Sequence, residues 1–347
     1  MATTTTAKFT VPLIEGERAL IDRMTTPSPE VRKAVSQIDD DLMILGVSGK
    51  MGPTLAELLV RAGARRRVLG VARFSDPAQR DALEAAGVRT IKCDLLDDSA
   101  LNALPDAGHI FLMAGFKFGA TGNEALTWAM NTLVPAKVMQ RFPKAKVVYV
   151  SSGNVYRFAR VDQGGAREGD PLEPIGEYAQ SRLGGERMVQ FYASRNGTPA
   201  VIVRLFYATE LRYGIILDIA TKVWGRRPID LAMGYVNQVW QGDANASLAR
   251  AFPLCESPAR VINLTGAEVL SVREVAQRLG AIVGVTPIFE GRESETALLG
   301  DATECLKAFG PPSVPPATLV EWVAHWVMCG GATLNKPTKY ESRTGTF

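Results

Sequence analysis

Short apolar segments alternate with helix-like segments from about residue 42 to residue 206. Six of these segments have the composition of buried strands: DLMILGV, RRVLGVA, VRTIKCD, HIFLMAG, KVVYVSS and PAVIVRLF. Continuous apolar strands joined by helices are typical of a parallel sheet covered on both faces. Because such crossovers are right-handed, the pattern predicts an α/β fold with a Rossmann-type, doubly wound parallel sheet.

The alternation of strands and helices ends after residue 206. Helical patterns follow in GIILDIATKVWGRRPIDL, DANASLARAF, SVREVAQRLGAIVG and PATLVEWVAHWVMCG, with one further strand in RVINLTG. A chain of 347 residues is too long for one ordinary core. We therefore predict a Rossmann domain over 41–206 and a smaller C-terminal α/β lobe over 207–330, interleaved with late sheet elements. Residues 1–40 are expected to form an arm and a helix, loose over 1–27, and residues 331–347 an extended tail.

The composition argues against several classes of partner. The net charge of +3 gives no reason to expect nucleic acid or an anionic membrane surface. Arg65, Arg66 and Arg67 form only a short run, which we interpret as a solvated loop. No run of 18 apolar residues suggests a membrane span, and four scattered cysteines indicate reduced thiols of a cytoplasmic protein. Two histidines offer little material for a metal site or a catalytic triad, so we expect no metal.

Three glycines stand where the first strand meets the first helix of the main domain. In ILGVSGKMGPTLAELL they are Gly46, Gly49 and Gly52. Gly46 permits a tight turn, Gly49 lets the backbone approach a pyrophosphate, and Gly52 lets the helix pack closely on the strand. The helix N-terminus favours the negative charge of that pyrophosphate, and Lys50 adds positive charge. The context predicts a dinucleotide site; the alternative is a tight turn without a ligand.

The end of the second strand bears on the choice of dinucleotide. Enzymes that use NAD usually carry an acid there, which binds the ribose 2′-hydroxyl. This chain has Ala72 followed by Arg73. Because an arginine fork suits a 2′-phosphate, we expect NADP or NAD, with NADP slightly favoured; the alternative is an Arg73 that points into solvent.

Several of these stretches together resemble the extended short-chain dehydrogenase/reductase family, in its NAD-dependent epimerase/dehydratase group. The glycine motif GVSGKMG, the third-strand motif KCDLLD and the fourth-strand motif FLMAG carry the resemblance, as do VSSGNVY, EYAQSRLGGE, RLF and QGDANA. It covers about residues 41–330. The resemblance implies cofactor contacts at Gly46, Gly49, Lys50, Met51, Gly52, Arg73, Asp94, Leu95, Ala114, Gly115, Tyr178 and Arg182.

The same resemblance implies a catalytic set and a reaction. Tyr178 is the expected acid/base, which exchanges the proton of a hydroxyl while hydride moves to or from the nicotinamide. Ser152 hydrogen-bonds the substrate oxygen, and Asn131 supports the active site. The implied function is that of an NAD(P)-dependent oxidoreductase or epimerase acting on a hydroxyl or ketone of a small carbohydrate-like substrate.

One departure from the family pattern concerns the catalytic residues. The lysine expected four residues after the tyrosine is Arg182. Arginine keeps the positive charge that favours the phenolate, but it is longer and planar and does not readily relay a proton. The alternative is a non-catalytic NAD(P)-binding sensor in which Arg182 is structural.

A second departure concerns the substrate. Nucleotide-sugar members usually carry an arginine where this chain has Val236, so a sugar, sugar acid or polyol fits better than a nucleotide sugar, which stays an alternative. Family members often form homodimers through two long helices, here expected around Leu126, Met130 and Val134 and in the helix that carries Tyr178. The candidate substrate-binding residues are Ser152, Asn154, Arg212, Trp240 and Gln241, with Tyr156 as a further candidate.

Overall fold

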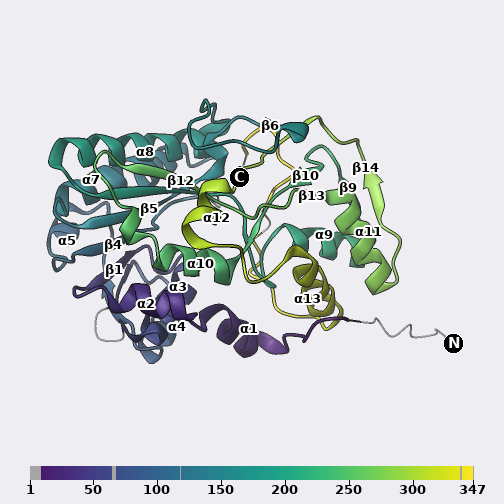
Figure 1. The fold of residues 1–347 in the computed structure, drawn as a ribbon, viewed down its shortest axis with the longest axis horizontal. Coiled ribbons are helices and arrows are strands. Elements are labelled where there is room, and N and C mark those ends of the chain that lie inside the picture. The colour runs from purple at the N-terminus through teal and green to yellow at the C-terminus, as the bar shows by residue number, and fades with distance from the viewer. Residues whose placement is uncertain (1–8, 65–67, 118, 337, 347) are drawn as a thin grey trace.

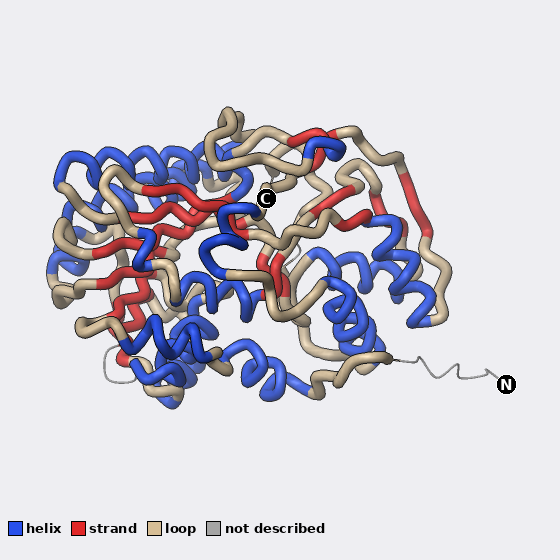
Figure 2. Tube along the Cα trace, in the orientation of Figure 1, coloured by secondary structure: helices blue, strands red, loops and turns tan. Residues whose placement is uncertain are grey.

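A seven-stranded parallel sheet forms the centre of the larger domain (Figures 1 and 2). The computed structural model describes residues 9–64, 68–117, 119–336 and 338–346. The strand order is β12-β7-β5-β4-β1-β2-β3, which confirms the predicted doubly wound topology. The strands are β1 (Leu42–Leu45), β2 (Val68–Ala72), β3 (Arg89–Lys92), β4 (His109–Leu112), β5 (Lys146–Ser152), β7 (Ala200–Leu205) and β12 (Arg260–Leu264).

Helices cover both faces of this sheet because its strands are apolar on both sides. In β1, Leu42 and Ile44 belong to one core cluster, and Met43 and Leu45 belong to another on the opposite face. The helices packed on the first face are α2 (Pro29–Ser36), α3 (Gly52–Leu59) and α10 (Gln241–Ala249). The second face carries α7 (Val134–Arg141) and α8 (Gly176–Asn196). Helices α4 (Pro77–Ala85), α5 (Asp98–Asn102) and α6 (Glu124–Trp128) complete the domain.

The smaller lobe has its own core around three helices, α9 (Ile215–Trp224), α11 (Val272–Val283) and α13 (Pro316–Met328). The predicted helix over GIILDIATKVWGRRPIDL is wrong in its second half. Helix α9 ends at Trp224, and β9 (Pro228–Asp230) pairs with β14 (Ile288–Glu290). Gly225 and Pro228 explain the end, since glycine weakens a helix and proline cannot donate to its hydrogen bonds.

Short elements connect the two lobes and the main helices. Two π-helical segments lie at Val60–Ala64 and Ala129–Leu133, and 3-10 helices lie at Gly153–Val155, Val161–Gln163 and Phe252–Leu254. The remaining elements are β6 (Ala159–Arg160), β8 (Ala208–Thr209), β10 (Tyr235–Val236), β11 (Val239–Trp240), β13 (Leu270–Ser271), β15 (Thr296–Ala297) and α12 (Thr303–Phe309).

The N-terminal region differs from the predicted loose arm. Residues Gly16–Thr25 form helix α1, which packs against α3 and α10. Leu20 and Met24 are one helical turn apart and both are buried, so this face is apolar although the helix is polar elsewhere. The predicted start of α2 is confirmed, because the Ser28 side chain accepts a hydrogen bond from the Val31 amide. The short arginine run lies outside the described residues.

The C-terminal tail has no helix or strand in its described part, as predicted, but it does not project into solvent. Thr338 and Tyr340 are each 1% exposed. Its end lies between the two lobes (Figure 1), where Gly345 approaches Gly176 at the start of α8. Among the described helices, none is long and apolar enough to cross a membrane.

Candidate active site

A cavity of about 500 Å³ opens at the carboxyl ends of the central strands. This edge of a doubly wound sheet is where ligands bind, because the loops that follow the strands diverge there. Every candidate cofactor residue from the sequence lines this cavity. So do the candidates Ser152 and Asn154. The cofactor candidates in its wall are Gly46, Gly49, Lys50, Met51, Gly52, Arg73, Asp94, Leu95, Ala114, Gly115, Tyr178 and Arg182.

The glycine turn has the geometry that the sequence suggests. Gly46 has a φ of 91°, and a Cβ there would lie 2.6 Å from the amide nitrogen of Ala114. A Cβ on Gly52 would lie 2.1 Å from the Val47 carbonyl oxygen, so α3 could not pack so close to β1 with any other residue. Gly49 is exposed to the cavity, and its amide donates to the Gly46 carbonyl. These contacts leave an uncovered backbone turn at the start of α3.

The ends of β2 and β3 form the far part of the cavity. Arg73 is exposed and is followed by Phe74, which is buried with a φ of 48°. A bulky residue with positive φ is strained, and buried packing holds this turn in place. Leu95 is buried beside the exposed Asp94, whose carboxylate accepts a hydrogen bond from the Leu96 amide.

Ser152, Asn154 and Tyr178 stand on the opposite side of the cavity. Ser152 ends β5, and its hydroxyl accepts hydrogen bonds from the amide of Asn154 at 3.2 Å and from its side chain at 3.1 Å. Tyr178 lies in the first turn of α8 and is half-buried. The Nζ of Lys117 lies 5.8 Å from the centre of its ring. Tyr156, the further substrate candidate, is instead buried beneath this wall with its hydroxyl bonded to Asn263.

Arg182 lies one helical turn after Tyr178 and is 4% exposed. Its guanidinium donates to the Ala114 carbonyl at 3.4 Å and to the Val150 carbonyl, and it lies 5.0 Å from the ring centre of Tyr149. Its Nε has no hydrogen-bond partner among the described residues, although it is buried. Arg182 thus ties α8 to the ends of β4 and β5 and retains one buried donor at the cavity.

Asn131 does not line the cavity but holds one of its walls. It is fully buried, accepts a hydrogen bond from the Phe116 amide at 2.8 Å, and donates to the Phe116 carbonyl and to the Ser181 hydroxyl. Asn131 lies in the π-helical segment Ala129–Leu133, and such segments are frequent at functional sites. The contact fixes the loop after β4, which includes Gly115 and Lys117.

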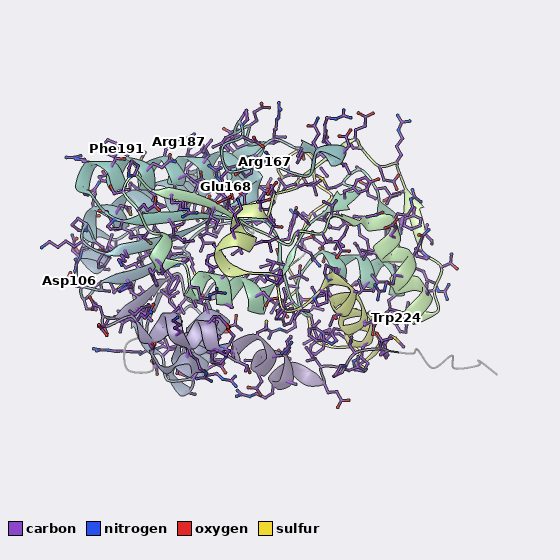
Figure 3. All side chains as sticks on the ribbon, viewed as in Figure 1. Asp106, Arg167, Glu168, Arg187, Phe191 and Trp224 are labelled. Carbon is purple, nitrogen blue, oxygen red and sulfur yellow. The ribbon has the colours of Figure 1, made fainter. Side chains whose placement is uncertain are left out.

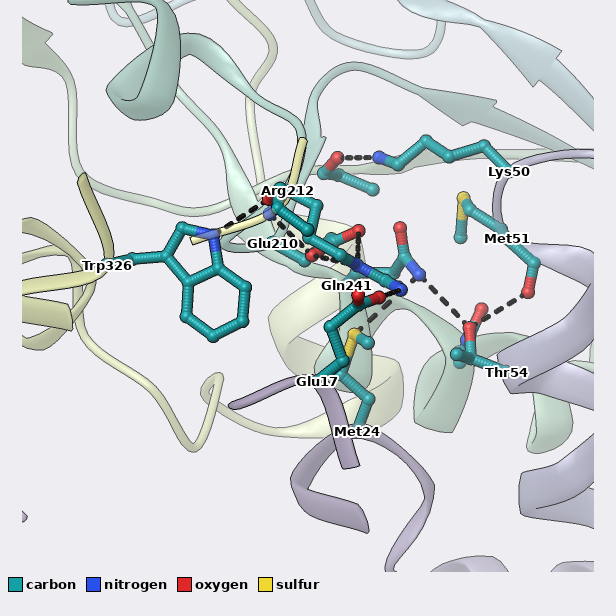
Figure 4. A network of polar contacts seen from close by, with 12 residues as sticks. Glu17, Met24, Lys50, Met51, Thr54, Glu210, Arg212, Gln241 and Trp326 are labelled. Carbon is teal, nitrogen blue, oxygen red and sulfur yellow. Dashed lines mark hydrogen bonds and ion pairs between the residues drawn. The ribbon is translucent and has the colours of Figure 1, made fainter. Parts of the chain in front are cut away.

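Two lysines of the cavity have lowered pKa values. Burial lowers the pKa of Lys50 to about 7, although Glu210 partly opposes the shift. The Nζ of Lys50 donates to the Ala208 carbonyl (Figure 4) and lies 4.0 Å from the ring centre of Tyr213. Burial likewise lowers the pKa of Lys117 to about 8. Lys117 was not among the candidates from the sequence. Its place two residues after Gly115 could have indicated that it lies in the same cavity.

Three candidate substrate residues lie away from the cavity. Arg212 forms ion pairs with Glu210 at 3.1 Å and with Glu17 at 2.9 Å (Figure 4). Trp240 packs in the core of the smaller lobe, and Gln241 donates to the Thr54 hydroxyl inside the protein. The structure therefore does not bring Arg212, Trp240 or Gln241 together with Ser152 and Tyr178. Sequence spacing could not show this, because all three residues follow β7 in the chain, and local sequence patterns do not reveal the path of the chain after that strand.

The wall of the cavity fits a dinucleotide. The neighbours of Gly46 and Gly49 at the turn are backbone atoms, and the Arg182 guanidinium lies beside Gly115. The buried Nε of Arg182 has no hydrogen-bond partner among the described residues. A parallel sheet in this strand order, with a glycine turn between β1 and α3, defines a dinucleotide-binding protein of the Rossmann class.

Comparison with known families agrees with this class. Residues 42–209 match the pattern of the "NAD dependent epimerase/dehydratase family". The resemblance predicted from the motifs is therefore confirmed over residues 42–209, which match the model of this family. Comparison with curated protein sequences finds no match.

Solved structures show the same fold at low sequence identity. UDP-glucuronic acid 4-epimerase from Bacillus cereus, in complex with NAD, is 18% identical with a TM-score of 0.68; the match covers 83% of this chain and 99% of that one. The dTDP-glucose 4,6-dehydratase DesIV from Streptomyces venezuelae, with NAD bound, is 19% identical with a TM-score of 0.69; the match covers 83% and 97%. These likenesses establish the architecture of the chain.

Proposed function

We propose that this protein is an NAD(P)-dependent oxidoreductase or epimerase that acts on a hydroxyl or ketone of a small carbohydrate-like substrate. The observation that carries the proposal is the common cavity of Tyr178, Ser152 and the glycine turn. A dinucleotide held by that turn supplies a hydride donor or acceptor at its nicotinamide ring. The protein then has to orient the substrate oxygen and move one proton.

Tyr178 is the proposed acid/base. As a phenolate, its oxygen takes the proton of the substrate hydroxyl during oxidation; as a phenol, it gives the proton back during reduction. Ser152 donates a hydrogen bond to the same substrate oxygen, and Asn154, which bonds the Ser152 hydroxyl, keeps that hydroxyl oriented. Asn131 acts as a positioning residue through the Phe116 loop.

Arg182 replaces the usual lysine in this scheme. Its positive charge lies one turn from Tyr178, inside the protein, where a charge acts more strongly on its neighbours than it would in water. Because its guanidinium bonds two backbone carbonyls, it is held in place and does not relay protons. We assign it an electrostatic role beside the bound cofactor.

For the cofactor, we propose NADP or NAD, with NADP favoured. The exposed Arg73 lines the cavity directly after Ala72, the position at the end of β2 where an acid would bind a ribose 2′-hydroxyl. A larger rise of the melting temperature with NADP than with NAD supports this choice, since a ligand that binds the folded state stabilises it. A larger rise with NAD would remove this role from Arg73.

A nucleotide-sugar epimerase or dehydratase is the second candidate, because two similar solved structures are a UDP-glucuronic acid 4-epimerase and a dTDP-glucose 4,6-dehydratase. Val236 is the residue in the place of the usual arginine clamp, and it is 2% exposed in the core of the smaller lobe. This difference favours the smaller substrate. Binding of a uridine or thymidine diphosphate sugar would reverse the preference.

The replacement Tyr178→Phe tests the proposal. We expect it to abolish turnover of sugars, sugar acids and polyols while the dinucleotide still raises the melting temperature. Turnover retained by this variant would refute the role of Tyr178. If the unmodified protein binds dinucleotide but transfers hydride to no substrate in the panel, the non-catalytic sensor becomes the better explanation.

We also propose a homodimer through α6, the following π-helical segment and α8, which pack side by side. Val134 is in the core and Met130 lines the cavity, so neither provides the contact. Exposed apolar side chains on these helices provide the contact instead. Leu126, Leu133 and Phe191 are 39%, 47% and 51% exposed. Phe191 lies on the outer side of α8 (Figure 3).

A further inference from the structure

Among the described residues, lysines from three separate parts of the chain line the cavity. Lys50 comes from the glycine turn, Lys117 from the loop after β4, and Lys336 from the C-terminal tail. Lys117 lies beside the Tyr178 ring, and Lys50 reaches Ala208 and Tyr213 at the start of the smaller lobe. Lys117 therefore brings positive charge beside the proposed acid/base, and Lys50 and Lys336 line the same cavity.

The carboxylates that act on Lys50 and Lys117 also bind other groups. Glu210 is engaged by Arg212, both through an ion pair and through the Arg212 amide at 2.8 Å. Asp218, which acts on Lys117, accepts hydrogen bonds from the amide and hydroxyl of Thr338 at 2.9 and 2.6 Å. Cations taken out of water are stabilised by an added anion, and burial here already lowers the pKa values of Lys50 and Lys117.

The tail is held firmly enough to place Lys336. The Leu334 amide donates to the Arg212 carbonyl at 3.0 Å, just before Lys336. Thr338 is bonded to Asp218 just after it, and Arg343 donates to the carbonyl and hydroxyl of Thr296 further along. Beyond Lys336 the tail forms a second small hollow, to which Lys339 contributes together with Asn154 and Tyr207 of the main cavity. The tail is thus a wall of the site.

We propose that the substrate carries an anionic group, a carboxylate or a phosphate, and that Lys336 and Lys117 bind it. The C-terminal tail is then a specificity element of the active site. This inference rests on the proposed function, because only an enzyme has a substrate. Binding of the anion can nevertheless be measured without turnover. Charge-assisted hydrogen bonds from two ammonium groups orient such a group, and a neutral polyol of the same length lacks them.

The test uses the full-length Tyr178→Phe protein saturated with its dinucleotide, so that no reaction interferes. Calorimetric titration compares D-gluconate, D-glucose 6-phosphate and the neutral D-glucitol. We expect at least one anion to bind about tenfold more tightly than D-glucitol, the amount that one charge-assisted contact supplies. Gluconate and glucose 6-phosphate distinguish a carboxylate from a phosphate.

Lys336→Gln, added to the same protein, tests the tail. Because the Lys336 side chain is exposed, this change leaves the packed core intact. We expect it to remove most of the anion preference and to leave the dinucleotide affinity unchanged. Lys144→Gln is the matched control. Lys144 is exposed and lies just before β5, at the amino ends of the strands, whereas the cavity lies at their carboxyl ends.

Three results would overturn the proposal. The first is equal binding of the anions and D-glucitol, and the second is no binding of either anion. The third is an equal loss of dinucleotide affinity and anion affinity in the Lys336→Gln protein. That result would mean that Lys336 binds the dinucleotide and not the substrate.

Discussion

Arg204 and Glu186 form a buried ion pair behind the cavity wall that carries Ser152 and Tyr178, with 2.8 Å between Nη2 and Oε2 and side chains 3% and 0% exposed. Glu186 also accepts a hydrogen bond from the Ser151 hydroxyl, next to Ser152. Arg204 donates to the Tyr156 hydroxyl at 2.7 Å, and Tyr156 donates to Asn263. The pair therefore joins α8, β5, β7 and β12 behind the residues proposed to act on the substrate.

Glu186→Gln should destabilise the protein by about 3–5 kcal/mol, because Arg204 is left buried without its counterion. Urea unfolding followed by circular dichroism measures the free energy. Replacing both residues, as Glu186→Gln with Arg204→Met, should cost less than the sum of the two single changes. Additive losses would show that the two side chains do not depend on each other.

Gly52→Ala and Gly49→Ala should separate folding from cofactor binding. In the first variant the added Cβ would meet the Val47 carbonyl, so we expect a loss of about 2 kcal/mol as α3 moves off β1. At Gly49 the nearest atom is the Gly46 carbonyl oxygen at 3.2 Å, and the added methyl group faces the cavity. That variant should fold normally and bind dinucleotide more weakly. Thermal melting with and without dinucleotide gives both quantities, and equal behaviour of the two variants would contradict the prediction.

Asn131→Ala should reduce turnover through the loop after β4. The change leaves the buried amide and carbonyl of Phe116 without their partner, which costs about 2 kcal/mol. Because the same loop carries Lys117, we expect kcat to fall while the dinucleotide affinity changes less. Steady-state kinetics at saturating cofactor measure this, and an unchanged kcat in folded protein would refute the positioning role.

Lys50 should make stability depend on pH. Its pKa is about 7 in the folded protein and 10.5 in its ordinary state, so unfolding takes up a proton between these values. The folded state therefore gains stability as the pH rises through this interval and is penalised below it. Urea unfolding at several pH values should show this gain in the unmodified protein and lose it in Lys50→Met. Parallel pH profiles of the two proteins would show that Lys50 keeps its proton.

Phe191→Glu should convert a homodimer into a monomer. The charge would be buried in the proposed interface on α8. Ile288→Glu is the control, since Ile288 is 49% exposed on β14 in the smaller lobe. Sedimentation equilibrium gives the masses. A monomeric unmodified protein, or dissociation caused equally by both variants, would contradict the proposed interface.

The sequence by itself predicted the central domain because its signals are local. Apolar runs such as LMIL and VLGVA permit little besides buried strands, and Gly46 to Gly52 follow such a strand directly. The motif order also located Ser152, Tyr178 and the departure at Arg182. The N-terminal helix was missed because its apolar face is narrow. A helix was wrongly predicted over Pro228–Asp230 because this strand is stabilised by pairing with Ile288–Glu290, far along the chain.

Only the tertiary structure decided which distant residues share the cavity. Arg212, Trp240 and Gln241 are polar or aromatic candidates by type, yet each contacts a partner from a distant helix. The partners are Glu17 of α1, Trp322 of α13 and Thr54 of α3. Lys336 carries no sequence signal that would place it in the cavity, and Lys117 has only its place two residues after Gly115. Both reach the cavity because a buried asparagine fixes one loop and Asp218 anchors the tail. Strands and turns follow from interactions between near neighbours, whereas the composition of the site depends on contacts between residues far apart in the chain.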